Sequence, residues 1–197
     1  MRKKAGEPSP HKAEDRNPLP VLKDWTHIDS QGRARMVNVS IKKVTLREAW
    51  AAGKVLMKAE TLKKIEDNSI EKGDVLSVAK IAALMAAKKT SDLIPMCHPL
   101  RITGIDLSFS FSHEPPQVGI LAKVQARDRT GVEMEALTAV AVAALTIYDM
   151  CKAIDREIQI TDVGLIKKSG GKSGVYIKKG YSRAKNGVKG QEGGYEY

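Results

Sequence analysis

Two neighbouring stretches of alternating residues constrain the fold of this chain more than any other feature. Apolar residues alternate with polar ones over residues 105–111 and again over residues 118–126. A period of two predicts half-buried β-strands. Because only the segment His-Glu-Pro-Pro-Gln separates the two stretches, they are predicted to pair as a β-hairpin.

Helical patterns flank this hairpin on both sides. Residues 61–67 form a short predicted helix, and residues 74–89 form a longer one. The apolar stripe of the longer helix is predicted at three- and four-residue spacings, on Val75, Val78, Ala82, Met85 and Ala86. A long helix is expected at about residues 133–156, and its alanine-rich middle implies burial on most sides.

The remaining elements complete a mixed pattern. Residues 45–52 are predicted as a short helix because Thr45 and Glu48 have the spacing of a capping box. Residues 54–57 and 158–166 are predicted strands. A hairpin with long helices between strands indicates an α+β fold, with an antiparallel sheet and helices packed on one face.

Both ends of the chain differ in composition from its middle. Residues 1–24 combine prolines and charges without periodicity, and residues 176–197 are rich in glycine and charge. Both are predicted to be adaptable tails around one domain at residues 25–175. The formal net charge of +10 favours anionic partners. Part of it lies in the tails, and few aromatic residues accompany it, which argues against a nucleic-acid partner.

Location is inferred from the cysteines and from apolar runs. The N-terminus is polar, and the longest apolar run, residues 137–148, is too short to span a bilayer. Cys97 and Cys151 lack zinc-type spacing. Cys97 and His98 are adjacent, which is an unfavourable geometry for binding one metal ion, and no third donor lies at motif spacing. We therefore expect a cytoplasmic protein with reduced thiols, no membrane partner and no metal site.

The segment Pro-Met-Cys-His-Pro-Leu at residues 95–100 holds a cysteine and a histidine between two prolines. Each proline fixes its own φ and disfavours helix at the residue before it. Two interpretations fit. Either the segment is a turn with a buried cysteine and a capping histidine, or Cys97 and His98 are held for use in a site.

The long helix carries charged residues at both ends. Glu133 and Glu135 in its first turn suit the helix dipole. Asp149 and Lys152 are three residues apart and share a face. They form either an exposed ion pair or, if partly buried, an acid–base pair.

Residues 167–174, Lys-Lys-Ser-Gly-Gly-Lys-Ser-Gly, resemble a phosphate loop without matching the Walker A pattern, because Ile166 stands where that pattern needs glycine. Three lysines and glycine-exposed backbone N–H groups make an anion cradle. The alternative is a basic linker.

Taken together, these segments resemble the cyclic pyranopterin monophosphate synthase family of molybdenum cofactor biosynthesis. The resemblance covers residues 26–174. It rests on blocks in the family's order, at residues 36–40, 72–75, 86–90, 93–100, 130–139, 143–153 and 168–174.

The resemblance implies a lyase that converts a cyclised dihydro-GTP into cyclic pyranopterin monophosphate and releases pyrophosphate. No redox cofactor is implied, and Mg²⁺ with the triphosphate stays open. A ferredoxin-like α+β sheet is expected, in a homohexamer built as a trimer of dimers with the active site at a dimer interface.

The resemblance also implies site residues. The catalytic set is Asp149, Lys152 and Lys72. The substrate-binding set is Met96, Cys97, His98, Glu133, Met134, Glu135, Arg47, Lys168 and Lys172.

This chain departs from the family at several positions. Asn38 stands where the family usually has Asp, and Met96 where it often has Leu. Gly164 stands where many members carry Arg, which puts the triphosphate contacts in question. A nucleic-acid-binding module and a purely structural subunit are the rival interpretations, but both leave Cys97, His98 and the Asp149–Lys152 pair unused.

Overall fold

The computed structural model describes residues 31–179. The chain divides into two compact units, Met1–Val37 and Asn38–Tyr197. Within the first unit the described residues, 31–37, form an irregular segment. The predicted tail at residues 1–24 lies outside the described residues. All helices and strands named below belong to the second unit.

A five-stranded antiparallel sheet forms one layer of the second unit, in the order β2-β3-β1-β4-β5. Its strands are β1 (Thr45–Leu56), β2 (Ile102–His113), β3 (Pro116–Asp128), β4 (Gln159–Ser169) and β5 (Tyr176–Ile177). The predicted hairpin is confirmed as β2 and β3. β5 lies inside the predicted C-terminal tail, and it joins the sheet by pairing with β4.

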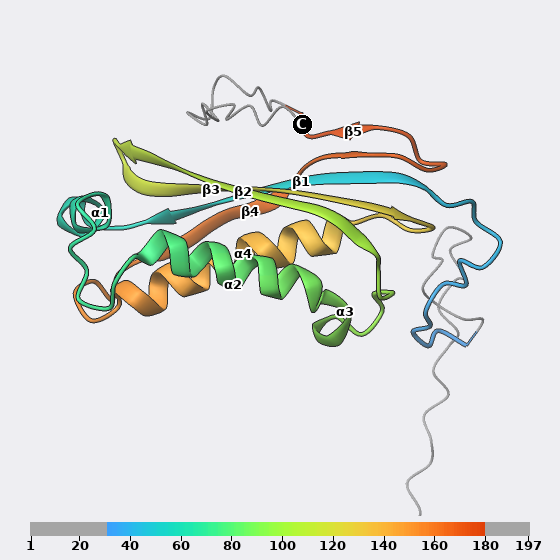
Figure 1. Cartoon of the computed structure of the whole chain (residues 1–197), viewed down its shortest axis with the longest axis horizontal. Coiled ribbons are helices and arrows are strands. Elements are labelled where there is room, and N and C mark those ends of the chain that lie inside the picture. Colours follow the sequence, from blue (N-terminus) through green and yellow to red (C-terminus); the bar gives the residue numbers. More distant parts are fainter. Residues whose placement is uncertain (1–30, 180–197) are drawn as a thin grey trace, which may run out of the picture. The chain divides into compact units, whose positions relative to one another are not determined.

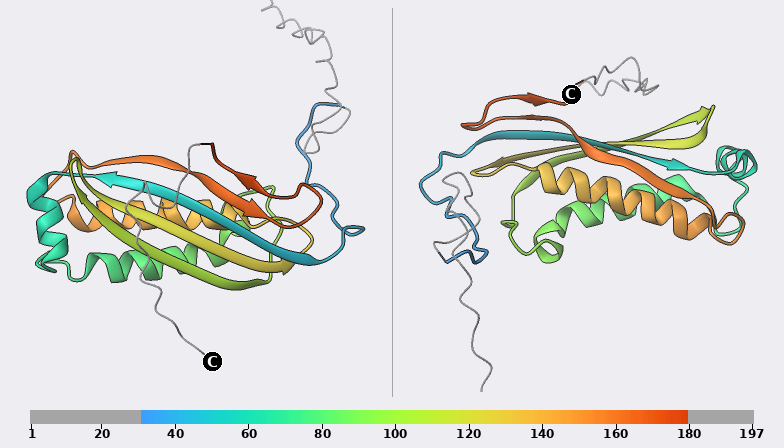
Figure 2. Two further views of the ribbon diagram at one scale, coloured as in Figure 1. Left: turned by 90° about the horizontal axis from the view of Figure 1, so that it is seen from above. Right: turned by 180° about the vertical axis from the view of Figure 1, so that it is seen from behind.

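Helices cover one face of this sheet. They are α1 (Ala59–Glu66), α2 (Val75–Lys88), α3 (Thr90–Leu93) and α4 (Glu133–Cys151). Figures 1 and 2 show α2 and α4 lying side by side along the same face of the sheet, while none of the helices of residues 31–179 lies on its other face. This arrangement confirms the predicted α+β fold with helices packed on the sheet.

α2 begins where its sequence predicts, but its buried face differs from the predicted stripe. The Asp74 side chain caps the helix by accepting a hydrogen bond from the Ser77 N–H at 3.0 Å. Alanines fill most of the buried face, which lets α2 pack closely against α4. The predicted core residues Val78 and Met85 are instead 43% and 56% exposed. Val78, Ile81 and Met85 therefore face outward.

The helix predicted at residues 45–52 is wrong, because this segment is the first part of β1. Ala49, Ala51 and Val55 are fully buried and alternate with half-buried residues. β1 pairs with β3 on one side and β4 on the other. Two rows of ladder hydrogen bonds and a buried face outweigh a local helical preference of this kind.

α4 is the central helix of the core. It has 19 residues and a mean hydropathy of 1.5, so length and composition alone would allow it to cross a membrane. Half of this apolar stretch is buried, as in the core helix of a globular domain. Ala136, Ala143 and Ile147 are fully buried, and α4 contacts both the sheet and α2. It ends at Cys151 rather than at the predicted residue 156.

Candidate functional site

The predicted site residues lie in two groups at opposite ends of α4. Glu133 and Glu135 stand in its first turn, whereas Asp149 and Lys152 stand at its end. With a rise of 1.5 Å per residue, Glu133 and Asp149 are separated by about 24 Å along the helix axis. A single chain therefore does not bring the two groups together.

Lys72, Asp149 and Lys152 make up the first group, here called the lysine cluster. Lys152 Nζ lies 2.6 Å from Asp149 Oδ1, and Lys72 Nζ lies 3.5 Å from Asp149 Oδ2. Lys72 Nζ also donates to the Asp149 main-chain oxygen at 2.7 Å. This oxygen belongs to the last turn of α4, where carbonyl groups lack partners within the helix. Lys72 therefore contacts both the main chain at the end of α4 and the Asp149 carboxylate.

The cluster is charged and half-exposed in the single chain. The side chains of Lys72, Asp149 and Lys152 are 45%, 59% and 51% exposed. The hydrogen bond and the charge of Lys152, together with the charge of Lys72, lower the pKa of Asp149. The hydrogen bond and charge of Asp149 raise the pKa of Lys152. Lys152 is thus held as an ammonium, which can donate a proton or stabilise negative charge.

A cationic cavity lies near the start of α4, at the opposite end from the lysine cluster. Its volume is about 760 Å³. Four of the predicted site residues line it, namely Arg47, Glu133, Lys168 and Lys172. The segment that enters α4 at residues 129–131 lines it too, so the helix N-terminus adds its favourable field for anions. We call this cavity the anion pocket.

Arg47 holds the wall of the anion pocket together. It is 9% exposed, and its guanidinium donates to the main-chain oxygens of Asp128 and Arg129, at 3.3 and 3.1 Å. These bonds fix the segment between β3 and α4. The same guanidinium packs against Gly171, where a side chain would collide with it. Gly170 and Gly171 also have φ angles of +96° and +72°, which favour glycine.

The loop after β4 contributes two lysines to the anion pocket. Lys168 Nζ lies 3.1 Å from Glu133 Oε1 and donates to Ser173 Oγ at 3.0 Å. Lys172 is exposed on the pocket wall. Two of the three lysines of the predicted anion cradle, Lys168 and Lys172, therefore line this cavity, whereas Lys167 pairs with Glu48. Its loop runs from β4 into β5, the first residues of the predicted tail, so it is a turn between two paired strands.

Sequence reasoning missed other cations of this pocket. Lys42, Lys43 and Arg129 line it as well. The basic pair Lys-Lys just before β1, and the arginine next to the recognised Thr-Gly-Val-Glu block, were the available signals. Each is an ordinary surface pattern on its own, and only the folded chain brings them to one cavity.

Lys178 lies beside Gly164, the position at which the resemblance to the family led us to expect arginine. Lys178 Nζ lies 3.7 Å from the point where a side chain on Gly164 would begin. Lys167 and Lys168, the expected substitutes, instead pair with Glu48 and Glu133. Lys178 follows β5, so the C-terminal segment supplies the charge beside Gly164.

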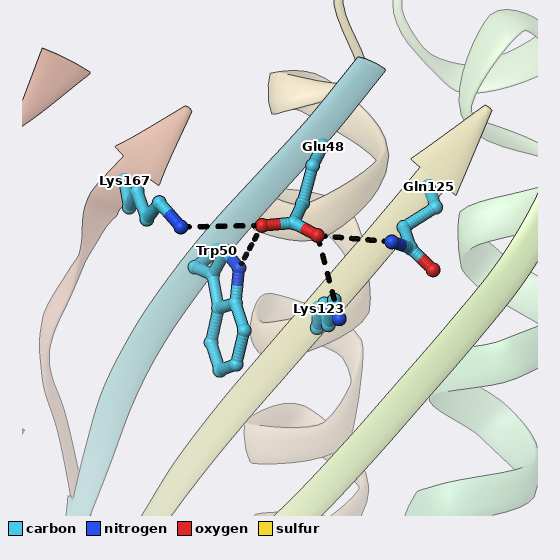
Figure 3. A network of polar contacts seen from close by, with 5 residues as sticks. All are labelled: Glu48, Trp50, Lys123, Gln125 and Lys167. Atoms are coloured by element: carbon cyan, nitrogen blue, oxygen red, sulfur yellow. Dashed lines mark hydrogen bonds and ion pairs between the residues drawn. The ribbon is translucent and has the colours of Figure 1, made fainter. Parts of the chain in front are cut away.

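Glu48 joins three strands on the open face of the sheet beside the anion pocket, as Figure 3 shows. It accepts hydrogen bonds from Trp50 Nε1 at 2.8 Å and Gln125 Nε2 at 2.9 Å, and it pairs with Lys123 and Lys167 at 3.3 and 3.4 Å. Burial would raise the pKa of Glu48, but the Trp50 hydrogen bond and the Lys123 charge outweigh it and lower the pKa. The prediction of a helix at this segment concealed the network.

Cys97 and Glu135 lie close together near the start of α4. Burial of Cys97 and the charge of Glu135 raise the pKa of the Cys97 thiol. Met96 and His98 flank Cys97 on the loop between α3 and β2, and all three are half-buried. The thiol is neutral at pH 7, which suits a contact surface better than a nucleophile.

Glu135 is nearly fully buried, at 3% exposure, and burial raises its pKa to about 7. Its proton is therefore bound more tightly in the folded chain than in the unfolded chain, so stability falls as pH rises from about 4.5 to about 7. We expect Glu135→Gln to remove this loss. The stability difference between variant and wild type then grows over that range to about 2–4 kcal/mol and stays level above it.

Urea unfolding at pH 5, 6, 7 and 8 measures this difference. Glu60→Gln is the matched control, because the Glu60 side chain is 80% exposed. A difference for Glu135→Gln that stays constant from pH 5 to 8 would show that the Glu135 carboxyl does not titrate in this window.

No group of three or more metal-ligating side chains lies among residues 31–179. Charged side chains of these residues gather instead in the anion pocket and in the lysine cluster. An α+β domain with these two features is suited to a phosphorylated small molecule and to proton transfer.

Comparisons with known proteins identify the family. The sequence model of the MoaC family matches residues 36–171. The chain is 62% identical over 151 residues to the cyclic pyranopterin monophosphate synthase of a Thermoanaerobacter species, covering 77% of this chain and 96% of the relative. The synthase of Heliobacterium modesticaldum is 57% identical over 153 residues, covering 78% and 96%. The chain belongs to the MoaC family.

A third relative has the same enzyme name. Cyclic pyranopterin monophosphate synthase 1 of Mycobacterium bovis is 58% identical over 151 residues, which cover 77% of this chain and 88% of the relative.

Proposed function

We propose that this chain converts (8S)-3',8-cyclo-7,8-dihydro-GTP into cyclic pyranopterin monophosphate and releases pyrophosphate, an early step of molybdenum cofactor biosynthesis. The observation that carries the proposal is the match to relatives of that name over nearly their whole length, at 62% and 57% identity. The anion pocket and the lysine cluster supply the two kinds of group that the reaction needs.

The phosphate chemistry needs positive charge at the leaving group. A substrate hydroxyl oxygen attacks the α-phosphorus and loses its proton to a base or to water. The bond from the α-phosphorus to the oxygen bridging the α- and β-phosphates breaks, and pyrophosphate leaves with both electrons of that bond. Arg47, Lys168 and Lys172 would bind the departing phosphates in the anion pocket. Fixed cations placed where charge develops lower such a barrier without reorganising.

Proton transfers rearrange the base portion into a pterin. Lys152, held as an ammonium, would donate a proton and take it back after it has been released, with Asp149 orienting it at 2.6 Å, and Lys72 would assist. Met96, Cys97 and His98 would form one wall for the ring system. Glu133, Met134 and Glu135 would form the other, with a carboxylate accepting hydrogen bonds from the N–H groups of the base.

The separation of the two groups supports a site shared between subunits. About 24 Å of helix lies between Glu133 and Asp149. A bound nucleotide-sized substrate is too short to contact both residues of one chain. A two-fold axis that sets two α4 helices antiparallel brings the lysine cluster of one chain to the anion pocket of the other, and it does so twice.

The outer surface of the helical layer suits this contact. Val78, Ile81 and Met85 form an outward stripe on α2, with exposures of 43%, 59% and 56%. Leu145, 57% exposed, lies one helical turn before Asp149 on α4. A second copy covering this surface would bury apolar area and remove water from the lysine cluster. We assign the protein to a homohexamer, a trimer of such dimers.

Other partners follow from the same chemistry. Six basic side chains of the described residues line one cavity, which suits a small anion. We therefore assign no nucleic-acid and no membrane partner, and we place the enzyme in the cytoplasm. We assign it no redox cofactor, since the net reaction moves protons and breaks a phosphoanhydride bond without changing the oxidation level.

The test is to incubate the purified chain with enzymatically prepared cyclic dihydro-GTP and to quantify pterin and pyrophosphate. We expect both products in equal amounts. Parallel reactions with EDTA and with added Mg²⁺ decide whether the triphosphate needs a cation. A folded oligomer that forms neither product, with or without Mg²⁺, would contradict the proposed function.

A further inference from the structure

Asp155 is a buried carboxylate that belongs to neither the anion pocket nor the lysine cluster. It is 1% exposed and lies just beyond the end of α4. Asp155 Oδ2 accepts hydrogen bonds from the Lys58 N–H at 2.8 Å and from Thr61 Oγ1 at 3.1 Å. Its Oδ1 accepts from the Glu157 N–H at 3.1 Å.

These bonds join two segments that are far apart in the sequence. Lys58 and Thr61 stand at the start of α1, and Lys58 is an N-cap residue whose own side chain makes no capping hydrogen bond. Asp155 supplies an acceptor there. α1 then leads into the loop that carries Lys72. Asp155 itself follows Lys152 by three positions, and its own N–H donates to the Cys151 oxygen at 3.0 Å.

The Asp155 carboxylate is ionised at neutral pH. Burial alone would raise its pKa, but hydrogen bonds from the N–H groups of Lys58 and Glu157 and from the Thr61 hydroxyl outweigh burial and lower the pKa. A buried ionised group that accepts three hydrogen bonds is costly to replace and holds its donors in a defined geometry.

We propose that Asp155 is a positioning residue of the lysine cluster: it fixes the start of α1 against the end of α4, so that Lys72 reaches the Asp149 main-chain oxygen and the Asp149–Lys152 pair keeps its place. The kinetic part of this inference rests on the proposed function. Its geometric part does not, because the contact between Lys72 and Asp149 exists in the chain without substrate.

The test compares Asp155→Ala, Asp155→Asn and Thr61→Val with wild type in the full-length protein. Val140→Ala is the matched control, because Val140 is a fully buried α4 residue that loses core packing without touching the cluster. Two readouts are independent of stability. One is the rate at which Lys72 is acetylated by a small reagent, followed by mass spectrometry. The other is the separate measurement of kcat and KM.

We expect Lys72 to be acetylated several times faster in Asp155→Ala, because it loses its hold on Asp149. We expect kcat to fall about 10- to 100-fold with little change in KM, because a small displacement of Lys72 and Lys152 from their productive positions slows the reaction. Asp155→Asn and Thr61→Val keep part of the hydrogen bonding and give smaller changes in the same direction, so they decide the matter if Asp155→Ala does not fold.

The inference is overturned if the Asp155 variants and Val140→Ala, compared at equal loss of Tm, share one Lys72 acetylation rate and one kcat. Asp155 would then serve stability alone. If wild type forms no product, the proposed function fails, and the acetylation rates still decide whether Asp155 positions Lys72.

Discussion

Replacing Lys152 with alanine is expected to lower turnover of cyclic dihydro-GTP by about 10³-fold, because the site would lose both a proton-transfer group and a positive charge. Lys152 Nζ lies 2.6 Å from Asp149 and is held as an ammonium at the end of α4. The loss should fall on kcat, because the anion pocket, where we propose that the phosphates bind, is untouched. Single-turnover measurement of pterin formation gives this number directly.

Two further variants define the role of Lys152. Lys152→Arg keeps the charge but cannot release a proton, so activity restored by arginine would indicate charge stabilisation alone. Lys64→Ala is the control, because Lys64 forms an exposed pair with Glu60 on α1. Turnover of Lys152→Ala within a factor of about three of wild type would remove Lys152 from the catalytic set.

Arg47→Ala is expected to lower kcat/KM by about 10²- to 10³-fold, because on our proposal the arginine binds phosphate as well as holding the pocket wall. It donates to the main-chain oxygens of Asp128 and Arg129 and packs against Gly171. Its removal leaves two carbonyl groups without their donor, so we also expect a loss of about 1–3 kcal/mol in unfolding free energy.

The arginine geometry can be separated from its charge. Arg47→Lys should restore little, because one ammonium cannot reach both carbonyl groups and a phosphate. Arg127→Ala is the control, since Arg127 is an exposed arginine on β3. Inhibition by added pyrophosphate should weaken in Arg47→Ala and stay at the wild-type level in Arg127→Ala. Unchanged pyrophosphate inhibition in Arg47→Ala would place the phosphates elsewhere.

Local patterns predicted most of the fold. The hairpin of β2 and β3 follows from its alternation, and α4 follows from its run of small apolar residues, because both signals persist over many residues. β1 could not be recognised in this way. Its first eight residues, Thr-Leu-Arg-Glu-Ala-Trp-Ala-Ala, include good helix formers, and only pairing with β3 and β4 makes them a strand.

The site was predictable in its residue types rather than in its arrangement. The basic loop and the Asp149–Lys152 pair are visible as sequence motifs, since short spacings fix which side chains share a face. The distance between them is a property of α4 as a straight 19-residue helix. Lys42, Lys43 and the Glu48 network depend on the position of β1, so the missed strand hid them as well.

The shared site is tested most directly by mixing two inactive variants. Lys152→Ala lacks the main cation of the lysine cluster, and Arg47→Ala lacks the main cation of the anion pocket. We expect each variant alone to be nearly inactive. Lys168→Ala replaces Arg47→Ala if the latter does not fold. After dissociation and reassembly of equal amounts, half of the two-fold dimers are mixed, and each of these contains one site built entirely from wild-type groups.

We predict that the mixture recovers about a quarter of wild-type activity, in line with random pairing at an isologous interface. The double variant Lys152→Ala/Arg47→Ala, mixed with either single variant, should recover none, because no pairing then yields an intact site. A mixture of the two single variants that stays as inactive as its components, although the subunits exchange, would show that each chain carries its own complete site and would contradict the assignment.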